Sequence, residues 1–273
     1  MFENLINILR DFRNYFFPNQ NPFGSKILAT KDYYLLAYEK AKNKKFLEID
    51  NLENTTGFNV NKSWLDELAL HTQVVKKKTS INYQHGRVLY SLLRKYIQDH
   101  NINYVKILEI GTARGFSSIC MSKAIIDSKI DGDIFTIDII SNKNKIYWNC
   151  IDDHDGKKSR QELLNPWQKE LKNINFLTGP SSLILNKINW DRINFAFIDG
   201  MHNDFNVRKE FKFISLKQTK GDFIIFDDYS TNFPDIVRFI NEIREDDVYD
   251  IKIVSSADVR SYAILQKKYE NSY

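Results

Sequence analysis

Acidic side chains directly follow four apolar segments in the second half of the chain. They are Glu109 after VKIL, Asp138 after IFTI, Asp199 after FAFI, and the pair Asp227 and Asp228 after FIIF. A carboxylate in this position would lie at the carboxyl edge of a parallel sheet, where doubly wound folds bind ligands. A single acid of this kind often caps the next helix, but four such strand ends predict one ligand-binding crevice.

A glycine-containing turn, EIGTARG over residues 109–115, follows the first of these segments. Glycine lets the backbone turn sharply and approach a ligand closely, and the next helix offers its first N–H groups. The glycines at 111 and 115 are four apart, unlike those of the dinucleotide pattern G-x-G-x-x-G. Asp138, 27 positions after Gly111, could accept hydrogen bonds from both hydroxyls of a ribose. The turn and this acid predict a cofactor site.

Short apolar runs alternate with longer amphipathic segments from Asn103 onward. This alternation predicts a parallel sheet with helices on both faces. The last two runs, VYDIKIV and SYAILQK, are separated by a short polar turn around residues 255–259. Because that turn is too short for a helical crossover, these strands must be antiparallel. The predicted fold class is α/β, a Rossmann-like, doubly wound, seven-stranded sheet with a terminal antiparallel strand.

The first hundred residues have a different character. Apolar side chains at helical spacing predict an amphipathic helix over Met1–Phe17, and residues 23–100 alternate aromatic-rich helical patterns with polar clusters. We therefore expect two parts: a helical N-terminal region over 1–79, which contacts the substrate or a second subunit of a homo-oligomer, and a Rossmann-like domain over 80–273.

Composition excludes several classes of protein. The net charge is only +4, from 39 Lys and Arg against 35 Asp and Glu, so we expect no nucleic-acid partner. Cys120 and Cys150 lack metal-ligand spacing and are interpreted as packing residues in a reducing compartment. No segment approaches the roughly 20 apolar residues that span a bilayer. We expect a cytoplasmic protein with no transmembrane segment and no cleaved signal peptide.

The segments LEIGTARGFSS, FTIDI, INFAFIDGMH and GDFIIFDDY together resemble the motifs of class I S-adenosylmethionine-dependent methyltransferases, over about residues 80–267. The resemblance implies that Gly111, Thr112 and Gly115 wrap the methionine part of the cofactor. It also implies that Glu109 lies beneath that part and that Asp138 holds the ribose.

The same resemblance places residues 179–182 near adenine, with Ser181 as the expected contact. The acidic residue often found after the glycine of this segment is replaced by Pro180. Asp199, at the end of the fourth strand, is expected to contribute to the cofactor site as well as to a metal site.

Within the superfamily, the sequence is most similar to metal-dependent O-methyltransferases that act on sugar hydroxyls of macrolides, and more distantly to catechol O-methyltransferases. This likeness rests on DGMH at 199–202 and on the acidic pair that follows the fifth strand. It implies Mg²⁺ or Mn²⁺ bound by Asp199, Asp227 and Asp228, since carboxylates suit hard octahedral ions. His202 would act as the catalytic base that takes the proton of the acceptor hydroxyl.

We therefore predict an S-adenosylmethionine-dependent O-methyltransferase of the divalent-metal-assisted type that acts on a hydroxyl of a sugar or other small molecule. One alternative is a non-catalytic S-adenosylmethionine-binding or scaffolding subunit, which keeps the fold without turnover. A less favoured alternative is an NAD-dependent oxidoreductase, against which the glycine spacing and the terminal antiparallel pair argue. A nucleic-acid amino-methyltransferase would carry a Pro-Pro-aromatic motif where this chain has Gly200-Met201-His202.

Overall fold

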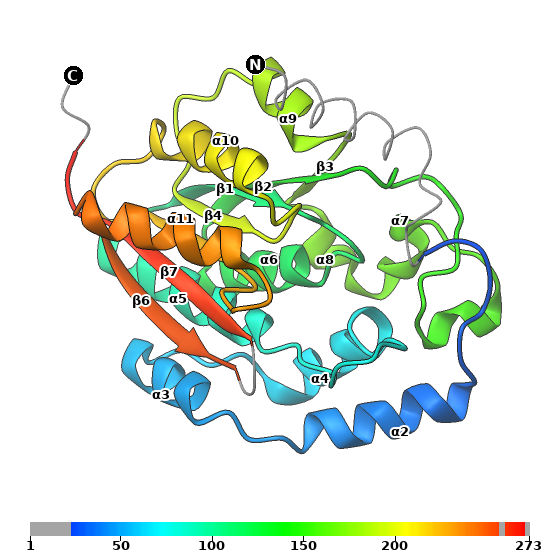
Figure 1. The fold of residues 1–273 in the computed structure, drawn as a ribbon. Coiled ribbons are helices and arrows are strands. Elements are labelled where there is room, and N and C mark those ends of the chain that lie inside the picture. Colours follow the sequence, from blue (N-terminus) through cyan, green and yellow to red (C-terminus); the bar gives the residue numbers. More distant parts are fainter. Residues whose placement is uncertain (1–22, 257–259, 271–273) are drawn as a thin grey trace.

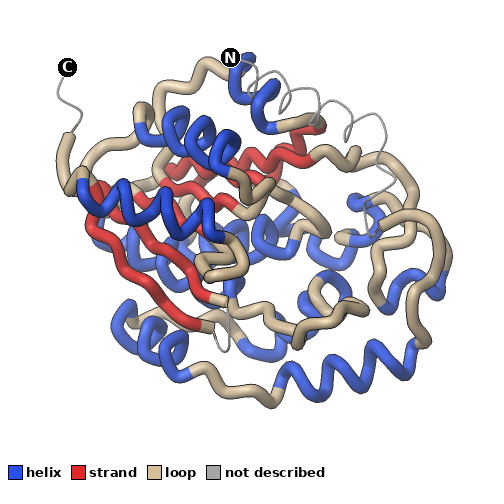
Figure 2. The backbone as a smooth tube through the Cα atoms, viewed as in Figure 1, coloured by secondary structure: helices blue, strands red, loops and turns tan. Residues whose placement is uncertain are grey.

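A mixed seven-stranded sheet forms the centre of the computed structural model, which describes residues 23–256 and 260–270 (Figures 1 and 2). The strand order is β3-β2-β1-β4-β5-β7-β6. The first five strands are parallel, and β7 is antiparallel to both β5 and β6. The predicted fold class is confirmed. The strands are β1 (Tyr104–Ile110), β2 (Asp131–Asp138), β3 (Ile174–Thr178), β4 (Phe195–Ile198), β5 (Phe223–Phe226), β6 (Tyr249–Ser255) and β7 (Ser261–Lys267).

The central strands are apolar on both faces because helices cover both sides of the sheet. All four residues of FAFI in β4 are buried, as are three of the four in FIIF of β5. Figure 1 shows α10 and α11 on one face and α5 and α6 on the other, and each pair of helices is in contact. These helices are α5 (His85–His100), α6 (Phe116–Ser128), α10 (Asp204–Ser215) and α11 (Pro234–Glu245).

Three further helices, α2 (Lys31–Lys42), α3 (Leu47–Thr56) and α4 (Lys62–Thr72), precede α5. They confirm the helical character predicted for residues 23–100, whereas the amphipathic helix predicted at 1–17 lies outside the described residues. Tyr34, Ile49 and Leu68 belong to the same buried cluster as Ile107 of β1. The helical part therefore shares a hydrophobic core with the sheet, and the predicted boundary at residue 79 stays a prediction.

Short elements fill the connections on either side of β3. They are η1 (Ile151–Asp155), α7 (Arg160–Leu163), η2 (Asn165–Trp167), α8 (Gln168–Leu171), α9 (Ser181–Ile184) and η3 (Leu185–Lys187). Cys120 and Cys150 are free and buried, as expected of packing residues. None of the helices in the described part combines the length and the apolar character needed to cross a membrane.

Candidate functional site

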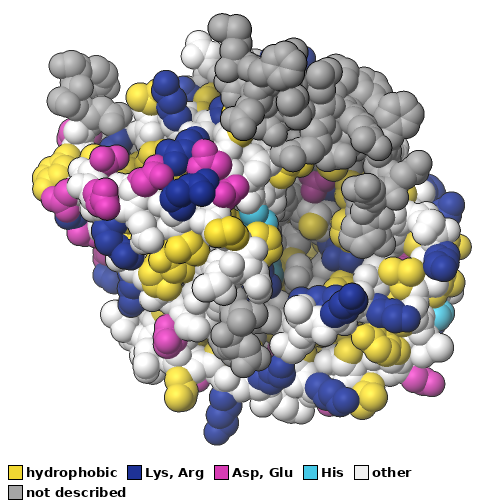
Figure 3. Space-filling view, in the orientation of Figure 1, with side chains coloured by type: hydrophobic (Ala, Val, Ile, Leu, Met, Phe, Trp, Pro, Cys, Tyr) yellow, Lys and Arg dark blue, Asp and Glu magenta, His cyan; other side chains and the backbone are white. Residues whose placement is uncertain are grey.

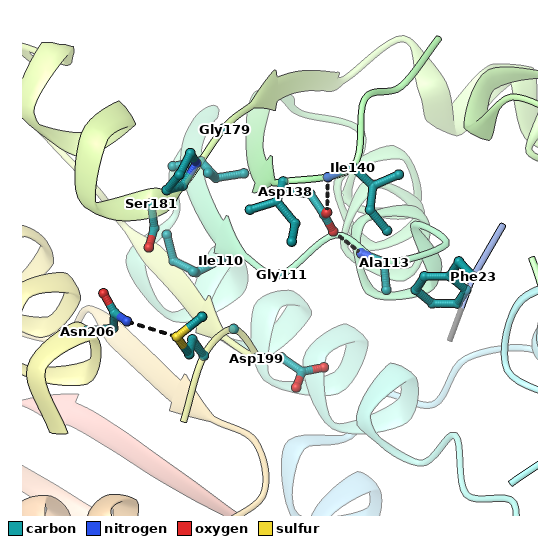
Figure 4. A pocket seen from close by; sticks show the side chains of 15 residues that line it. Phe23, Ile110, Gly111, Ala113, Asp138, Ile140, Gly179, Ser181, Asp199 and Asn206 are labelled. Carbon is teal, nitrogen blue, oxygen red and sulfur yellow. Dashed lines mark hydrogen bonds between the residues drawn. The ribbon is translucent and has the colours of Figure 1, made fainter. Parts of the chain in front are cut away.

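A cavity of about 330 Å³ lies at the carboxyl ends of the parallel strands (Figure 4). This is the sheet edge at which the sequence predicts a crevice. Its lining comes from the ends of β1 to β4, from the start of α10 and from one residue that precedes α2: Phe23, Ile110, Gly111, Ala113, Ile137, Asp138, Ile139, Ile140, Gly179, Pro180, Ser181, Asp199, Gly200, Met201 and Asn206.

Gly111 joins three strand ends at the floor of this cavity. Its φ of +96° lies in the left-handed region, and a Cβ at this position would lie 2.0 Å from the carbonyl oxygen of Asp199. Its N–H donates to the Ile137 carbonyl at 2.9 Å. Glycine is therefore required here by the close approach of the β1 turn to the β4 turn as well as by its conformation.

Three residues support the glycine-containing turn after β1 without lining the cavity: Glu109, Thr112 and Gly115. The buried Glu109 carboxylate accepts hydrogen bonds from Ser117 and Ser118 at the start of α6. Burial raises the pKa of Glu109, and these hydroxyl donors oppose the shift. The Thr112 hydroxyl contacts that of Thr136, and Gly115 packs against Leu164.

Asp138, at the end of β2, lines the cavity and holds two backbone segments. Its carboxylate oxygens accept from the Ala113 N–H at 2.6 Å and the Ile140 N–H at 2.7 Å (Figure 4). Burial raises the pKa of Asp138, and the Arg160 guanidinium, 3.6 Å away, opposes this shift. The Thr112 backbone also contributes a hydrogen bond to this carboxylate, and a carboxylate offers about four lone-pair sites, so these contacts do not use all of its acceptor capacity.

The sequence analysis did not identify Arg160, although it braces this end of the site. Its side chain is 1% exposed and lies against the Trp148 and Phe176 rings. Nε donates to the Ala113 carbonyl at 2.8 Å. The local sequence signal is a capping box from Ser159 to Glu162, which marks the start of a helix and gives no hint of a role in the site.

A second group of side chains lies beside the cavity. His202 Nε2 is 3.7 Å from an Asp199 oxygen and 3.3 Å from an Asp228 oxygen. One potential ligand atom from each of these three residues lies within 4.8 Å of the others. We call Asp199, His202 and Asp228 the acidic cluster. Asp199 belongs both to this cluster and to the cavity wall.

Asp227 is placed differently from the other acids of the predicted metal site. Its buried carboxylate is held by both nitrogens of a fork from Arg260, with Nε donating at 2.9 Å. Arg260 Nε also lies 3.5 Å from an Asp228 oxygen. The three acids that the sequence predicts as metal ligands, Asp199, Asp227 and Asp228, thus lie at one edge of the sheet. His202, however, is grouped with Asp199 and Asp228. Asp227 instead faces Arg260.

The charges at this edge are only partly balanced. Burial, followed by the Asp227 carboxylate, raises the pKa of Asp199 well above its ordinary value. Burial would also raise the pKa of Asp227, but the Arg260 guanidinium outweighs it and lowers that pKa. A cation beside Asp199 and Asp228 would relieve the repulsion between the carboxylates.

Comparisons with known proteins relate this chain to methyltransferases. Residues 108–229 match a family described as a methyltransferase domain. A similar solved structure is the O-methyltransferase TomG from Streptomyces achromogenes, involved in tomaymycin synthesis and in complex with SAM, with 14% identity, a TM-score of 0.53, and coverage of 77% of this chain and 92% of that one. The O-methyltransferase NovP has 14% identity, a TM-score of 0.50, and coverage of 82% and 97%. No curated protein matches the sequence.

Proposed function

We propose that this chain is a class I S-adenosylmethionine-dependent methyltransferase whose methyltransferase domain spans residues 108–229. In this proposal it transfers the methyl group to a hydroxyl of a sugar or other small molecule with the help of a divalent metal ion. One observation carries the proposal: Asp199 joins the wall of the cofactor cavity to the acidic cluster. The methyl donor and a metal-held acceptor would therefore meet at this residue. TomG and NovP are both O-methyltransferases, which supports oxygen as the acceptor atom in this chain.

Different residues of the cavity are proposed to contact different parts of the cofactor. Gly111 allows the methionine part to approach the backbone, and Asp138 accepts hydrogen bonds from the ribose hydroxyls. Ser181 lies near the adenine, at the end of the cavity after β3. Glu109, Thr112 and Gly115 act from beneath by holding the turn and the start of α6 in place.

The acidic cluster fits a hard divalent ion. Asp199 and Asp228 are the ligands that we propose, because their carboxylates lie together at the cavity and suit Mg²⁺ or Mn²⁺. Asp227 adds a third negative charge, oriented by Arg260. When bound, the ion would lower the pKa of an acceptor hydroxyl and help to orient it.

His202 is placed to take the proton of that hydroxyl. Its Nε2 faces both carboxylates of the cluster, and these would stabilise the imidazolium once the proton has been transferred to Nε2. The sulfonium of the cofactor supplies the reactive methyl group, and the protein supplies alignment and charge compensation. An acceptor can approach from solvent, since the side chains of Asp199, His202 and Asp228 are 31%, 14% and 26% exposed. Figure 3 shows that one face of the molecule is hollowed near its middle.

The substitution Asp228→Asn tests the metal role with little disturbance of the backbone. Asp228 has a φ of +56°, a left-handed conformation that Asn accepts readily. We expect metal-dependent transfer of labelled methyl from S-adenosylmethionine to a panel of sugars and diols to fall by about 100-fold or more. Calorimetry should show cofactor affinity within about twofold of wild type, because the lost charge lies outside the cofactor lining.

Asp247→Asn is the matched control, since Asp247 has a φ of +53° and is exposed. It should leave turnover unchanged. Turnover that survives EDTA, or an Asp228→Asn enzyme as active as the control, would contradict the metal assignment. Cofactor binding with no turnover on any acceptor would favour the scaffolding alternative.

A further inference from the structure

A second cavity, of about 270 Å³, lies between α2 and the segment over residues 75–81 that precedes α5. Three lysines line it: Lys40 on α2, Lys44 just after this helix, and Lys77 on the segment. None of the described lining residues is acidic, and in the described part of the chain none of the three lysines forms an ion pair. We call this cavity the lysine groove. Its positive charge is therefore available to a ligand.

Asn149 holds the two walls of the lysine groove together. Its buried side-chain oxygen accepts from the Tyr34 hydroxyl of α2 at 3.2 Å and from the Lys76 N–H at 3.0 Å. Its Nδ2 donates to the Lys76 carbonyl at 3.0 Å. The two walls are thus fixed relative to each other before a ligand binds, which lowers the entropy cost of binding.

The segment that carries Lys77 leads toward the acidic cluster. The carbonyl of Asn82, which follows this segment, lies 3.5 Å from Arg260 Nη1, and Arg260 pairs with Asp227 and lies 3.5 Å from Asp228. Burial, followed by repulsion from Arg260, lowers the pKa of Lys77 to about 8, and attraction to Asp228 and Asp227 opposes this shift. The lysine groove and the acidic cluster are therefore close enough for one small molecule to meet both.

The charges of the two places sort the groups of such a molecule. Lysine ammonium groups are compact charges that suit phosphate, whereas the carboxylates beside the cofactor cavity repel an anion. Tyr33, Leu36 and Ile81 add apolar surface to the lysine groove, and pockets of this kind bind the carbon skeleton of a ligand while a few polar groups orient it.

We propose that the lysine groove binds a phosphate group of the acceptor, so that the methyl acceptor is a phosphorylated sugar whose free hydroxyl reaches the acidic cluster. The phosphate lies among Lys40, Lys44 and Lys77, and Lys77 determines specificity because it is the one nearest the site of transfer. The inference rests on the proposed function for the role of the hydroxyl, but binding of phosphate can be measured without turnover.

Calorimetry with inorganic pyrophosphate, glucose 1-phosphate and glucose tests the lysine groove. EDTA is present throughout, so that no metal ion holds the phosphate. Wild type should bind pyrophosphate at millimolar concentration and should bind glucose 1-phosphate about tenfold or more tightly than glucose. The double variant Lys40→Gln/Lys77→Gln, which removes one charge from each wall, should bind both phosphates about tenfold more weakly.

Lys169→Gln/Lys172→Gln is the matched control, because both lysines are exposed at α8 and the variant loses the same net charge. It should bind both phosphates within about twofold of wild type, since exposed charges far from a ligand are screened by salt.

Three outcomes would overturn the inference: wild type that does not bind pyrophosphate, equal affinities for glucose and glucose 1-phosphate, or equal weakening in the groove variant and in the control. The proposed function fails separately. If phosphate binding depends on Lys40 and Lys77 but S-adenosylhomocysteine does not bind, the lysine groove is supported and the cofactor assignment is refuted.

Discussion

The Asp138 carboxylate holds two backbone segments and, under the proposed function, also the ribose of the cofactor. It accepts N–H groups from the glycine turn and from the segment after β2, and so it joins the two sides of the cavity before any ligand binds. Arg160 balances its charge from below. A ribose would then meet a carboxylate whose position is already fixed, which lowers the entropy cost of binding.

Asp138→Asn should therefore weaken binding of S-adenosylhomocysteine by about 10- to 100-fold, the effect of losing hydrogen bonds to a charged acceptor. The amide NH₂ of Asn cannot accept from either backbone N–H, so the turn would also lose one of its supports. Calorimetry provides the measurement. Asp133→Asn, on the same strand but facing Tyr104 and Asn175, should bind normally. Unchanged affinity in Asp138→Asn would remove this residue from the proposed site.

The sequence could predict the positions of the acids but not their partners. The apolar run FAFI directly precedes Asp199, and the apolar run FIIF directly precedes Asp227 and Asp228. These runs place the three acids at the carboxyl edge of the sheet. Arg260, which pairs with the Asp227 carboxylate, lies 33 residues further along the chain. No local pattern links the two residues.

At the scale of elements, the turn after β1 decides how closely β1 and β4 approach each other. Gly111 packs against the Asp199 carbonyl so tightly that any side chain would force the two strand ends apart. Gly156, which ends η1, has a nearly identical φ of +99° but would place its Cβ in open space. These two glycines separate the effect of conformation from the effect of packing.

Gly156→Ala should lower the free energy of unfolding by about 1–3 kcal/mol, because its φ of +99° and ψ of −178° belong to a region that only glycine adopts readily. Gly111→Ala should lower it further, by about 4 kcal/mol or more, because a steric clash adds to the cost of a positive φ. Urea denaturation of both variants measures the difference. Equal losses would show that the strand ends relax freely and that the close approach is unimportant for stability.

The strands were easier to predict than the connections. Apolar runs of strand length predict β1, β2, β4 and β5. The short turn before β7 requires β6 and β7 to be antiparallel. The stretch over residues 160–171, between β2 and β3, is divided into α7, η2 and α8. Pro166 lies in the first turn of η2, where its missing N–H and fixed φ interrupt a continuous helix.

At the scale of the whole molecule, the helical N-terminal part and the sheet form one packed body. They share a buried cluster, and Phe23, from the N-terminal part, lines the cofactor cavity. The Arg114 guanidinium lies 4.5 Å from the Phe23 ring. Because such contacts join residues far apart in sequence, a pattern of helical spacing predicts the helices without predicting that a residue of the N-terminal part reaches the cavity.

Crystals grown with S-adenosylhomocysteine and Mn²⁺ provide the most direct test of a shared cofactor and metal site, since manganese gives an anomalous signal. We predict that the ribose lies against Asp138 and that a manganese peak lies at coordination distance from Asp199 and Asp228. A nucleoside bound outside the cavity, or a manganese peak away from the acidic cluster, would contradict the proposed mechanism.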